Sequence, residues 1–259
     1  MNSFNSRDLT SVAAKIVQIN VWEGRHLASL LQFLAEENPD VLCAQEVVTA
    51  PDGMEIAINH EVHKLLYSMF AYQYFSPTVV YNLDGDMVTM GNAIYSVWPI
   101  ENAQTVFTYG QGVHVETVDE FDYNIRNIQV CQLRVEPNKM ITIANYHGYH
   151  EPNSHGSDKS VQTMQRAADV LQDVSGPMIV CGDFNVNPQS PAMRPFDSLK
   201  LRNLTVESGL KTTLSRASHV RVPVICDYIL TSEDIVVNDF TVSDKLVSDH
   251  KAQILTFSV

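Results

Sequence analysis

The segment MIVCGDFNVNPQSP, residues Met178 to Pro191, holds the pattern that decides the fold. An apolar run rich in β-forming residues ends in Gly-Asp-Phe-Asn, so a carboxylate and a carboxamide follow a predicted buried strand two residues apart. Side chains at alternate positions of an extended backbone point to the same side. The pattern therefore predicts that Asp183 and Asn185 face one common site while Phe184 packs away from it.

The composition indicates a globular chain with an acidic excess. The 259 residues are 45% hydrophobic, and 17 Lys and Arg against 30 Asp and Glu give a net charge of −13. This balance disfavours a broad basic face for duplex DNA, although it is compatible with a local basic groove. Because the sequence contains no apolar run of membrane length and no signal-peptide pattern, we expect no membrane span and a cytoplasmic location. No protein partner is implied.

The cysteines lie inside strand-like apolar runs and form no CxxC pair. They are Cys43, Cys131, Cys181 and Cys226. This pattern favours buried free thiols in a reducing cytosol, and it gives no case for structural zinc.

Strand patterns and helix patterns alternate along the chain. Helices are predicted at Leu27–Glu37, His60–Phe70, Lys159–Val174 and shortly after Pro191. Strands are predicted at Lys15–Val21, Val41–Gln45, Tyr72–Ser76, Gly91–Val97, Ile125–Val135, Met140–Tyr146, from Met178, and at Val224–Leu230, Ile235–Val242 and Ala252–Phe257. A hairpin-like LDGD turn within Thr78–Met90 is expected at the rim. The order predicts an α/β fold with two sheets packed face to face and helices outside. Residues 1–14 form a polar segment and residues 15–259 one domain.

Polar residues recur where the predicted strands stop. They are Asn20, Glu46, His147, Asp183, Asn185, Asp227, Asp249 and His250. Each alone is commonly a turn former or a helix cap, but repetition across separated strands indicates that one sheet edge collects acids, amides and histidines. Clustered carboxylates repel one another unless a cation lies among them. Oxygen donors without paired cysteines suit Mg²⁺ or Mn²⁺.

A set of motifs in this order resembles the endonuclease/exonuclease/phosphatase superfamily, the deoxyribonuclease I-like proteins. The motifs are QIN-V-W, CAQE, GNAIYSVWPI, NYH, GDFNVNPQSP, CDYIL and VSDH, and they span Lys15 to Val259. The combination of GDFN with SDH near the end of the sequence is specific. The resemblance implies a four-layer α/β sandwich with two mixed β-sheets, and hydrolysis of phosphoester bonds.

The resemblance also implies a role for each strand-end residue. Glu46, Asn20 and Asp249 would bind the divalent metal. Asp183 would orient and deprotonate the attacking water, and Asn185 would hold the water or a phosphate oxygen. His250, paired with Asp227, and His147 would face the phosphoryl oxygens as positive partners.

Departures from the family pattern limit the assignment. The chain reads QEVVTAPDG where the apurinic endonuclease branch has QETK, which weakens an abasic-site function. Ile225 replaces the arginine that commonly precedes the DYIL aspartate, so another group must support Asp227. Arg126 is either a phosphate clamp or a surface ion-pair partner. His150 is either a substrate contact or part of an ordinary loop.

Three functions are compatible with these patterns. The first is a metal-dependent phosphodiesterase acting on a nucleic-acid phosphodiester, which we favour. The second is a phosphoesterase for a nucleotide, a sugar or inositol phosphate, or a sphingomyelin-type headgroup, which the acidic balance favours. The third is an inactive binding protein, and the intact set of Glu46, Asp183, Asn185, Asp249 and His250 argues against it.

Overall fold

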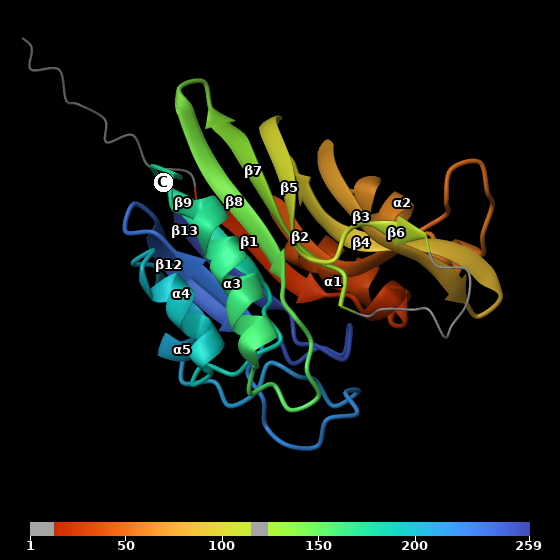
Figure 1. Cartoon of the computed structure of the whole chain (residues 1–259). Coiled ribbons are helices and arrows are strands. Elements are labelled where there is room, and N and C mark those ends of the chain that lie inside the picture. Colours follow the sequence, from red (N-terminus) through yellow and green to blue (C-terminus); the bar gives the residue numbers. More distant parts are fainter. Residues whose placement is uncertain (1–12, 115–123) are drawn as a thin grey trace, which may run out of the picture.

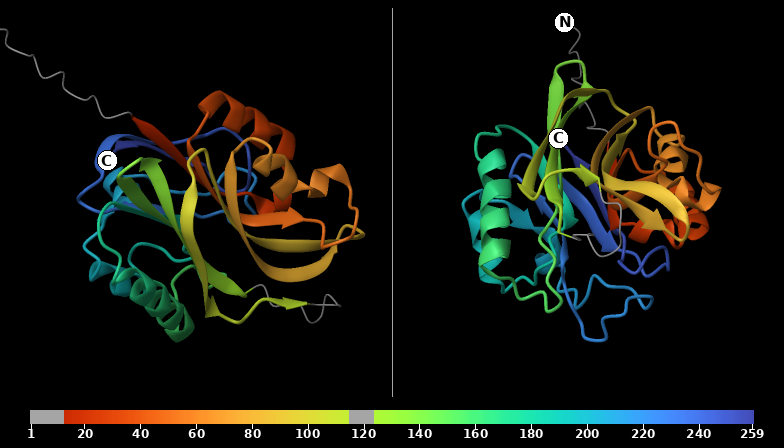
Figure 2. Two further views of the ribbon diagram at one scale, coloured as in Figure 1. Left: turned by 90° about the horizontal axis from the view of Figure 1, so that it is seen from above. Right: turned by 45° about the vertical axis from the view of Figure 1, so that its right-hand side comes forward.

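Two mixed β-sheets lie face to face with helices on both outer sides. The computed structural model describes residues 13–114 and 124–259, so most of the predicted polar segment 1–14 lies outside the described residues. Helices α1 and α2 cover one sheet and α3 and α4 cover the other (Figures 1 and 2). The four-layer α/β sandwich predicted from the sequence is confirmed.

The described strands form one seven-stranded and one six-stranded sheet. The first contains, in spatial order, β12 (Val236–Val242), β13 (Gln253–Ser258), β1 (Ala14–Asn20), β2 (Val41–Thr49), β4 (Asp86–Ser96), β3 (Tyr72–Leu83) and β6 (Val113–His114). The second contains β10 (Arg202–Asn203), β11 (Asp227–Thr231), β9 (Met178–Asp183), β8 (Lys139–His147), β7 (Arg126–Glu136) and β5 (Ile100–Tyr109). Strands β1 and β2 run parallel, as do β8 and β9, so the site residues of each pair leave the same end of their sheet.

The helices are short except for two. They are α1 (Leu27–Glu37), α2 (Val62–Tyr67), α3 (Asp158–Leu171), α4 (Arg194–Asp197) and α5 (Leu204–Glu207), with 3₁₀ turns η1 (Trp22–Gly24), η2 (Ile58–His60) and η4 (Pro191–Met193). Helix α1 has the predicted bounds because leucines recur on its buried face and Asn38 ends it in a left-handed conformation. None of the helices in the described ranges is long and apolar enough to cross a membrane.

Four strand predictions differ from the structure. Strand β5 was missed because its first half, including Glu101 to Gln104, is exposed and shows no apolar alternation. The short strands β6 and β10 were missed as well. Strand β11 begins at Asp227 rather than Val224. The predicted LDGD hairpin turn is present, and it joins β3 to β4 with Leu83 paired to Asp86.

The interface between the sheets is apolar at one end. Its core includes Ile16, Val41, Ile143, Ile179 and Leu255. The buried thiols of Cys43, Cys131 and Cys181 lie in the same cluster, and all four cysteines are free, as predicted. This end fixes the spacing of the two sheets by burial of hydrophobic surface.

Buried polar side chains, four amides and one hydroxyl, occupy the interface between that core and the site. We call them the polar seam: Gln18, Gln45, Asn145, Gln129 and Ser76. Gln18 Nε2 donates to Gln45 Oε1 (3.1 Å), and Gln45 Nε2 donates to Asn145 Oδ1 (2.6 Å). Asn145 Nδ2 donates to Gln129 Oε1 (3.0 Å), and Gln129 Nε2 donates to Ser76 Oγ (2.8 Å). The Gln45–Asn145 and Gln129–Ser76 bonds cross from one sheet to the other, so they set the relative register of the sheets.

We expect Asn145→Ala to destabilise the protein by about 3 kcal/mol, because it leaves Gln45 Nε2 and Gln129 Oε1 buried without partners. Urea unfolding followed by circular dichroism measures the change. The exposed amide Asn102 on β5 provides the control, and Asn102→Ala should cost less than about 0.5 kcal/mol. Equal losses in the two variants would contradict a structural role for the seam.

Candidate active site

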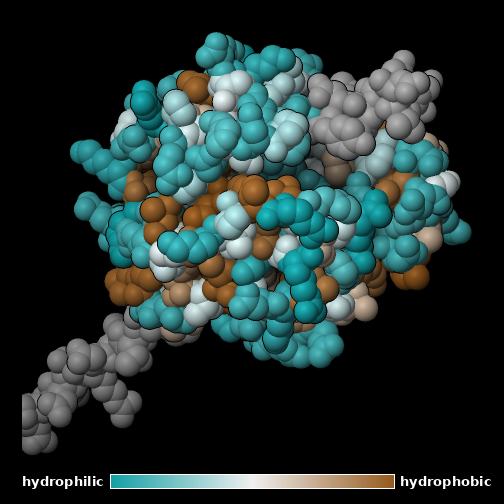
Figure 3. Space-filling model, turned by 90° about the horizontal axis from the view of Figure 1, so that it is seen from below, coloured by the Kyte–Doolittle hydropathy of each residue, from teal (hydrophilic) through white to brown (hydrophobic). Residues whose placement is uncertain are grey.

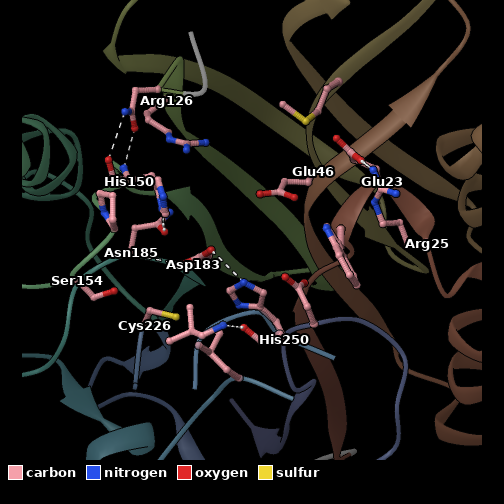
Figure 4. A pocket seen from close by; sticks show the side chains of 18 residues that line it. Glu23, Arg25, Glu46, Arg126, His150, Ser154, Asp183, Asn185, Cys226 and His250 are labelled. Atoms are coloured by element: carbon pink, nitrogen blue, oxygen red, sulfur yellow. Dashed lines mark hydrogen bonds and ion pairs between the residues drawn. The ribbon is translucent and has the colours of Figure 1, made fainter. Parts of the chain in front are cut away.

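A cavity of about 760 Å³ opens at the ends of β2 and β9, and we call it the site cavity. Figure 4 shows Glu46 projecting into it from one side, and Asn185 and His150 from the other. Of the ten residues predicted from the sequence, seven line the cavity: Glu46, Arg126, His150, Asp183, Asn185, Asp249 and His250. The remaining three, Asn20, His147 and Asp227, are buried and in contact with residues of that lining. The structure thus brings the whole predicted set together.

The turn after β9 places Asp183 and Asn185 in the cavity, but not through extended alternation as predicted. Strand β9 ends at Asp183, and Asn185 has a left-handed backbone with φ of 58°. The Asn185 N–H donates to Asp183 Oδ1 (2.9 Å), which closes a turn between them. Phe184 is fully buried against Tyr146 and Tyr228, as expected.

A β-bulge turns Glu46 into the cavity. The register of β2 against β4 shifts between Ala44 and Val47, and Glu46 has a φ of 56°, which is rare for a residue with a side chain. Burial raises the pKa of Glu46 to about 7, although 26% of its side chain is exposed to the cavity. Such a carboxylate is strained and poorly solvated, which is typical of a functional position.

Asn20 contacts two carboxylates through its side-chain nitrogen, whereas the sequence predicted Asn20 as a ligand of the metal. Its Nδ2 donates to Glu46 Oε1 (2.9 Å) and to Asp183 Oδ2 (3.2 Å). Its Oδ1 accepts a hydrogen bond from the N–H of Trp22 (3.0 Å). In this orientation Asn20 Nδ2 orients the two carboxylates, and its Oδ1 keeps a second lone pair.

The predicted pair of His250 and Asp227 is present. His250 Nδ1 lies 2.9 Å from Asp227 Oδ2, and His250 Nε2 points toward Asp183 Oδ2 at 3.7 Å. Burial lowers the pKa of His250, but the neighbouring Asp227 and Asp183 carboxylates outweigh it and hold the pKa well above its usual value. His250 therefore stays protonated near neutral pH.

Groups that the sequence reasoning did not assign support Asp227 in place of the missing arginine. Gln18 Nε2 donates to Asp227 Oδ1 (3.3 Å), and Cys226 Sγ donates to Asp227 Oδ2 (3.4 Å). Gln18 lies two residues before Asn20 on the same face of β1, so the period of two along the strand is the signal that could have identified it. No sequence pattern indicates that Gln18 pairs with Asp227, which lies 209 residues away on the other sheet.

His147 and Arg126 form the wall opposite His250. Arg126 Nη1 lies 3.1 Å from His147 Nε2, and this nitrogen lies 3.9 Å from both Glu46 Oε1 and Asp183 Oδ2. Burial and then the Arg126 charge hold the pKa of His147 well below its usual value. His147 is therefore neutral, and the expectation of two positive histidines is wrong. The buried Arg126 supplies the second positive charge, which excludes the surface ion-pair alternative.

The two other histidines of the β8–α3 loop have different positions. His150 lines the cavity, and its Nδ1 lies 3.1 Å from Asn185 Oδ1. His155 lies 2.9 Å from Asn187 Nδ2 and does not line the cavity. Of the two, only His150 is placed to contact a substrate.

The donor set fits a divalent cation. Burial raises the pKa of Asp183 to about 6, with a further increase from the neighbouring Asp227 carboxylate. Glu46 and Asp249 offer further carboxylate oxygens to the same cavity. A cation would relieve this repulsion, and hard oxygen donors suit one such as Mg²⁺. Asp183, Cys226 and His250 also bring one ligand atom each within 4.8 Å of one another, which the sequence did not indicate.

The fold is that of the deoxyribonuclease I-like phosphoester hydrolases. Residues 17–250 match the model of the Endonuclease/Exonuclease/phosphatase family. The chain therefore belongs to this family, whose members are phosphoester hydrolases and are generally dependent on a divalent metal. No curated protein matches the sequence.

Solved structures with the same fold share little sequence with the chain. An endonuclease/exonuclease/phosphatase from Beutenbergia cavernae is 16% identical, with a TM-score of 0.72 over 95% of this chain and 72% of that one. The human nocturnin catalytic domain with bound sulfate is 18% identical, with a TM-score of 0.68 over 97% of both chains. A mannosyl-6-phosphatase from Bacteroides thetaiotaomicron is 15% identical, with a TM-score of 0.63 over 95% of this chain and 100% of that one.

We expect Glu46→Gln to stabilise the metal-free protein at pH 8 by about 2 kcal/mol, because a buried carboxylate whose pKa is raised to about 7 opposes folding when it is ionised. The destabilisation by Glu46 grows between its unfolded pKa of 4.5 and about 7, so the two proteins should be equally stable near pH 4. Urea unfolding in EDTA measures both values. If the wild type is more stable than Glu46→Gln at pH 8, the ionised Glu46 carboxylate does not oppose folding and the prediction fails.

Proposed function

We propose that this protein is a divalent-metal-dependent phosphodiesterase that hydrolyses nucleic-acid phosphodiester bonds through an activated water. The observation that supports this most is the arrangement of Glu46 and Asp183 with the charged His250–Asp227 pair around one cavity. Carboxylates that can hold a cation, facing a protonated imidazole, would stabilise the charge that builds on a phosphoryl group under attack.

Glu46 and Asp249 would hold Mg²⁺ or Mn²⁺. Both carboxylates line the cavity, and Ser248 Oγ donates to Asp249 Oδ1 (3.1 Å). Asn20 Nδ2 would fix the orientation of Glu46 through its 2.9 Å hydrogen bond. When bound, the ion would polarise a phosphoryl oxygen and lower the pKa of a coordinated water.

Asp183 would act as the general base. Its Oδ1 is held by the Asn185 N–H, which leaves Oδ2 directed toward the cavity to accept a proton from water. A pKa of about 6 lies close to neutral pH, where a base is ionised yet still basic enough to be effective. The Asn185 carboxamide would orient the water or a phosphate oxygen.

His250 and Arg126 would bind the non-bridging phosphate oxygens. His250 Nε2 is its free donor because Nδ1 is bonded to Asp227. Arg126 brings a buried permanent charge from β7 on the opposite wall. Neutral His147 accepts a hydrogen bond from Arg126 and would position the guanidinium rather than supply charge.

We expect Asp183→Ala and His250→Ala each to reduce hydrolysis of bis(p-nitrophenyl) phosphate by about a thousandfold or more with Mg²⁺ or Mn²⁺ present, because each removes a proton-transfer or charge-stabilising group. EDTA should abolish the wild-type activity. Asp239→Ala on β12, an exposed acid away from the cavity, is the matched control and should leave the rate unchanged. Wild-type turnover in either site variant would refute the assigned roles.

A small-molecule phosphoester is the second candidate substrate. The net charge of −13 disfavours long polyanions, and a cavity of about 760 Å³ is in the range that encloses a small ligand. The structural similarity to a mannosyl-6-phosphatase is compatible with this reading.

A substrate panel separates the two candidates. It should contain single-stranded DNA, duplex DNA, RNA, nucleotides, inositol phosphates, sugar phosphates and sphingomyelin, each with Mg²⁺ or Mn²⁺. We expect turnover of single-stranded nucleic acid at a higher kcat/KM than that of any small ester. Turnover of a small ester with no product from the nucleic acids would replace the first candidate by the second.

We also propose that residues 15–259 form one catalytic domain. The family match over residues 17–250 and the pairing of β1 with β13 support this. The cytoplasmic location stays a prediction from the sequence.

A further inference from the structure

A second cavity adjoins the site cavity, and we call it the side groove. It has a volume of about 490 Å³ and shares Leu214 and Val220 with the lining of the site cavity. Its cationic lining residues are Arg216, Arg221 and Lys251. The site cavity and the side groove are therefore adjacent, and the groove places these basic side chains next to the carboxylates of the site cavity.

The segment 208–226 that builds the groove has a charge opposite to that of the whole chain. It contains Lys211, Arg216 and Arg221 and no acidic residue, whereas the chain carries a net charge of −13. Arg216 and Arg221 are exposed, and within the described ranges neither forms an ion pair. Lys251 is paired with the exposed Asp244 at 2.7 Å, so the two arginines provide the uncompensated charge of the groove.

The base of this segment is fixed to the chain that carries the site residues. The Ser215 N–H donates to the carbonyl of Asp249 (2.7 Å), and the Lys251 N–H donates to the carbonyl of Thr213 (2.7 Å). Leu214 forms an isolated β-bridge with His250. The segment projects from the lower edge of the molecule in Figure 1, and Figure 3 views that mostly hydrophilic face from below. The groove is thus held next to the scissile position.

An aromatic side chain lines the site cavity and touches the basic segment. Trp22 is half-buried, and its ring lies edge-on to His219 at 6.1 Å between centroids. The hydrogen bond from its N–H to Asn20 Oδ1 fixes its backbone, which has a φ of 49°. A tryptophan beside a phosphate-binding depression can stack with an unpaired nucleobase.

We propose that the side groove binds a single-stranded oligonucleotide, with Arg216 and Arg221 holding the phosphate next to the scissile one and Trp22 stacking on a base. The proposal rests on the phosphodiesterase function proposed above and names its substrate class. Duplex DNA fits less well, because the cations are confined to one narrow groove and an unstacked base suits Trp22.

The kinetic test compares a substrate that reaches the groove with one that does not. Hexathymidylate carries phosphates beyond the scissile bond, whereas thymidine 5′-(p-nitrophenyl phosphate) carries one phosphodiester. We expect the double variant Arg216→Gln and Arg221→Gln to raise KM for hexathymidylate about tenfold. Its KM for the small ester should stay within twofold of the wild-type value. The salt dependence of log(kcat/KM) for hexathymidylate should become less steep by about 1.4, as for two lost single-strand phosphate contacts.

The matched control is Lys64→Gln with Lys200→Gln, which removes the same charge from exposed positions. Lys64 lies on α2, and Lys200 precedes β10, which pairs with the end of β11 far from Asp227. This control should leave KM unchanged for both substrates. Equal effects of the two double variants, or an equal effect of the arginine variant on both substrates, would overturn the proposal.

A binding measurement tests the groove without catalysis. The chain has two tryptophans, and Trp98 lies in a separate cavity beside Phe257, so Trp98→Phe leaves Trp22 as the reporter. In a Trp98→Phe and Asp183→Asn chain with Mg²⁺, hexathymidylate should quench the fluorescence, and the arginine pair of substitutions should weaken binding about tenfold. If the arginine substitutions do not weaken the binding that the quenching measures, the proposal that the groove binds the oligonucleotide is overturned. If neither ester is hydrolysed by the wild type while quenching depends on the arginines, the proposed hydrolysis fails and the groove stands.

Discussion

The polar seam between the two sheets constrains everything at the catalytic end of the molecule. Along the inward face of the central strands, apolar side chains are followed by buried amides and then by site residues. The progression is seen in Ile16, Gln18 and Asn20 on β1 and in Ile143, Asn145 and His147 on β8. On β9 the apolar Cys181 takes the place of the amide before Asp183. A buried amide is costly unless its donors and acceptors are satisfied. The sheets therefore have one relative placement that satisfies the seam, and this placement brings the carboxylates of both sheets to a common edge.

The electrostatic organisation of the site follows from that placement. Glu46 enters from one sheet and Asp183 from the other. Burial raises the pKa of both, and a neighbouring carboxylate adds to the increase, Asp249 beside Glu46 and Asp227 beside Asp183. His250 is held protonated by its acidic neighbours, whereas His147 is held neutral by burial and by Arg126. The histidine that ends β8 and the histidine that precedes β13 thus differ in charge because of the groups that surround them.

The sequence predicted the layers, the strand ends and the membership of the site, but not its local geometry. Strand-end acids and amides repeat visibly. Gln18 and Asn145 look like ordinary interruptions of an apolar run until their cross-sheet partners, Asp227 and Gln45, are known. The left-handed backbones of Glu46 and Asn185 were unpredictable because neither position is a glycine. Asn20 directs its Nδ2 toward the carboxylates because its Oδ1 accepts a hydrogen bond from the N–H of Trp22. No residue pattern predicts this contact.

Strand β1 lies between β2 and β13, so a strand from the beginning of the chain is hydrogen-bonded on one side to the last described strand. During synthesis β1 and β2 emerge from the ribosome long before residues 253–258 do, and the open edge of β1 must wait unpaired. Contacts separated by more than 200 residues, such as that of Gln18 with Asp227, close late in folding. A nascent chain therefore cannot assemble the site until residues 253–258 have emerged, and during that interval the open edge of β1 is exposed to strand-exchange aggregation.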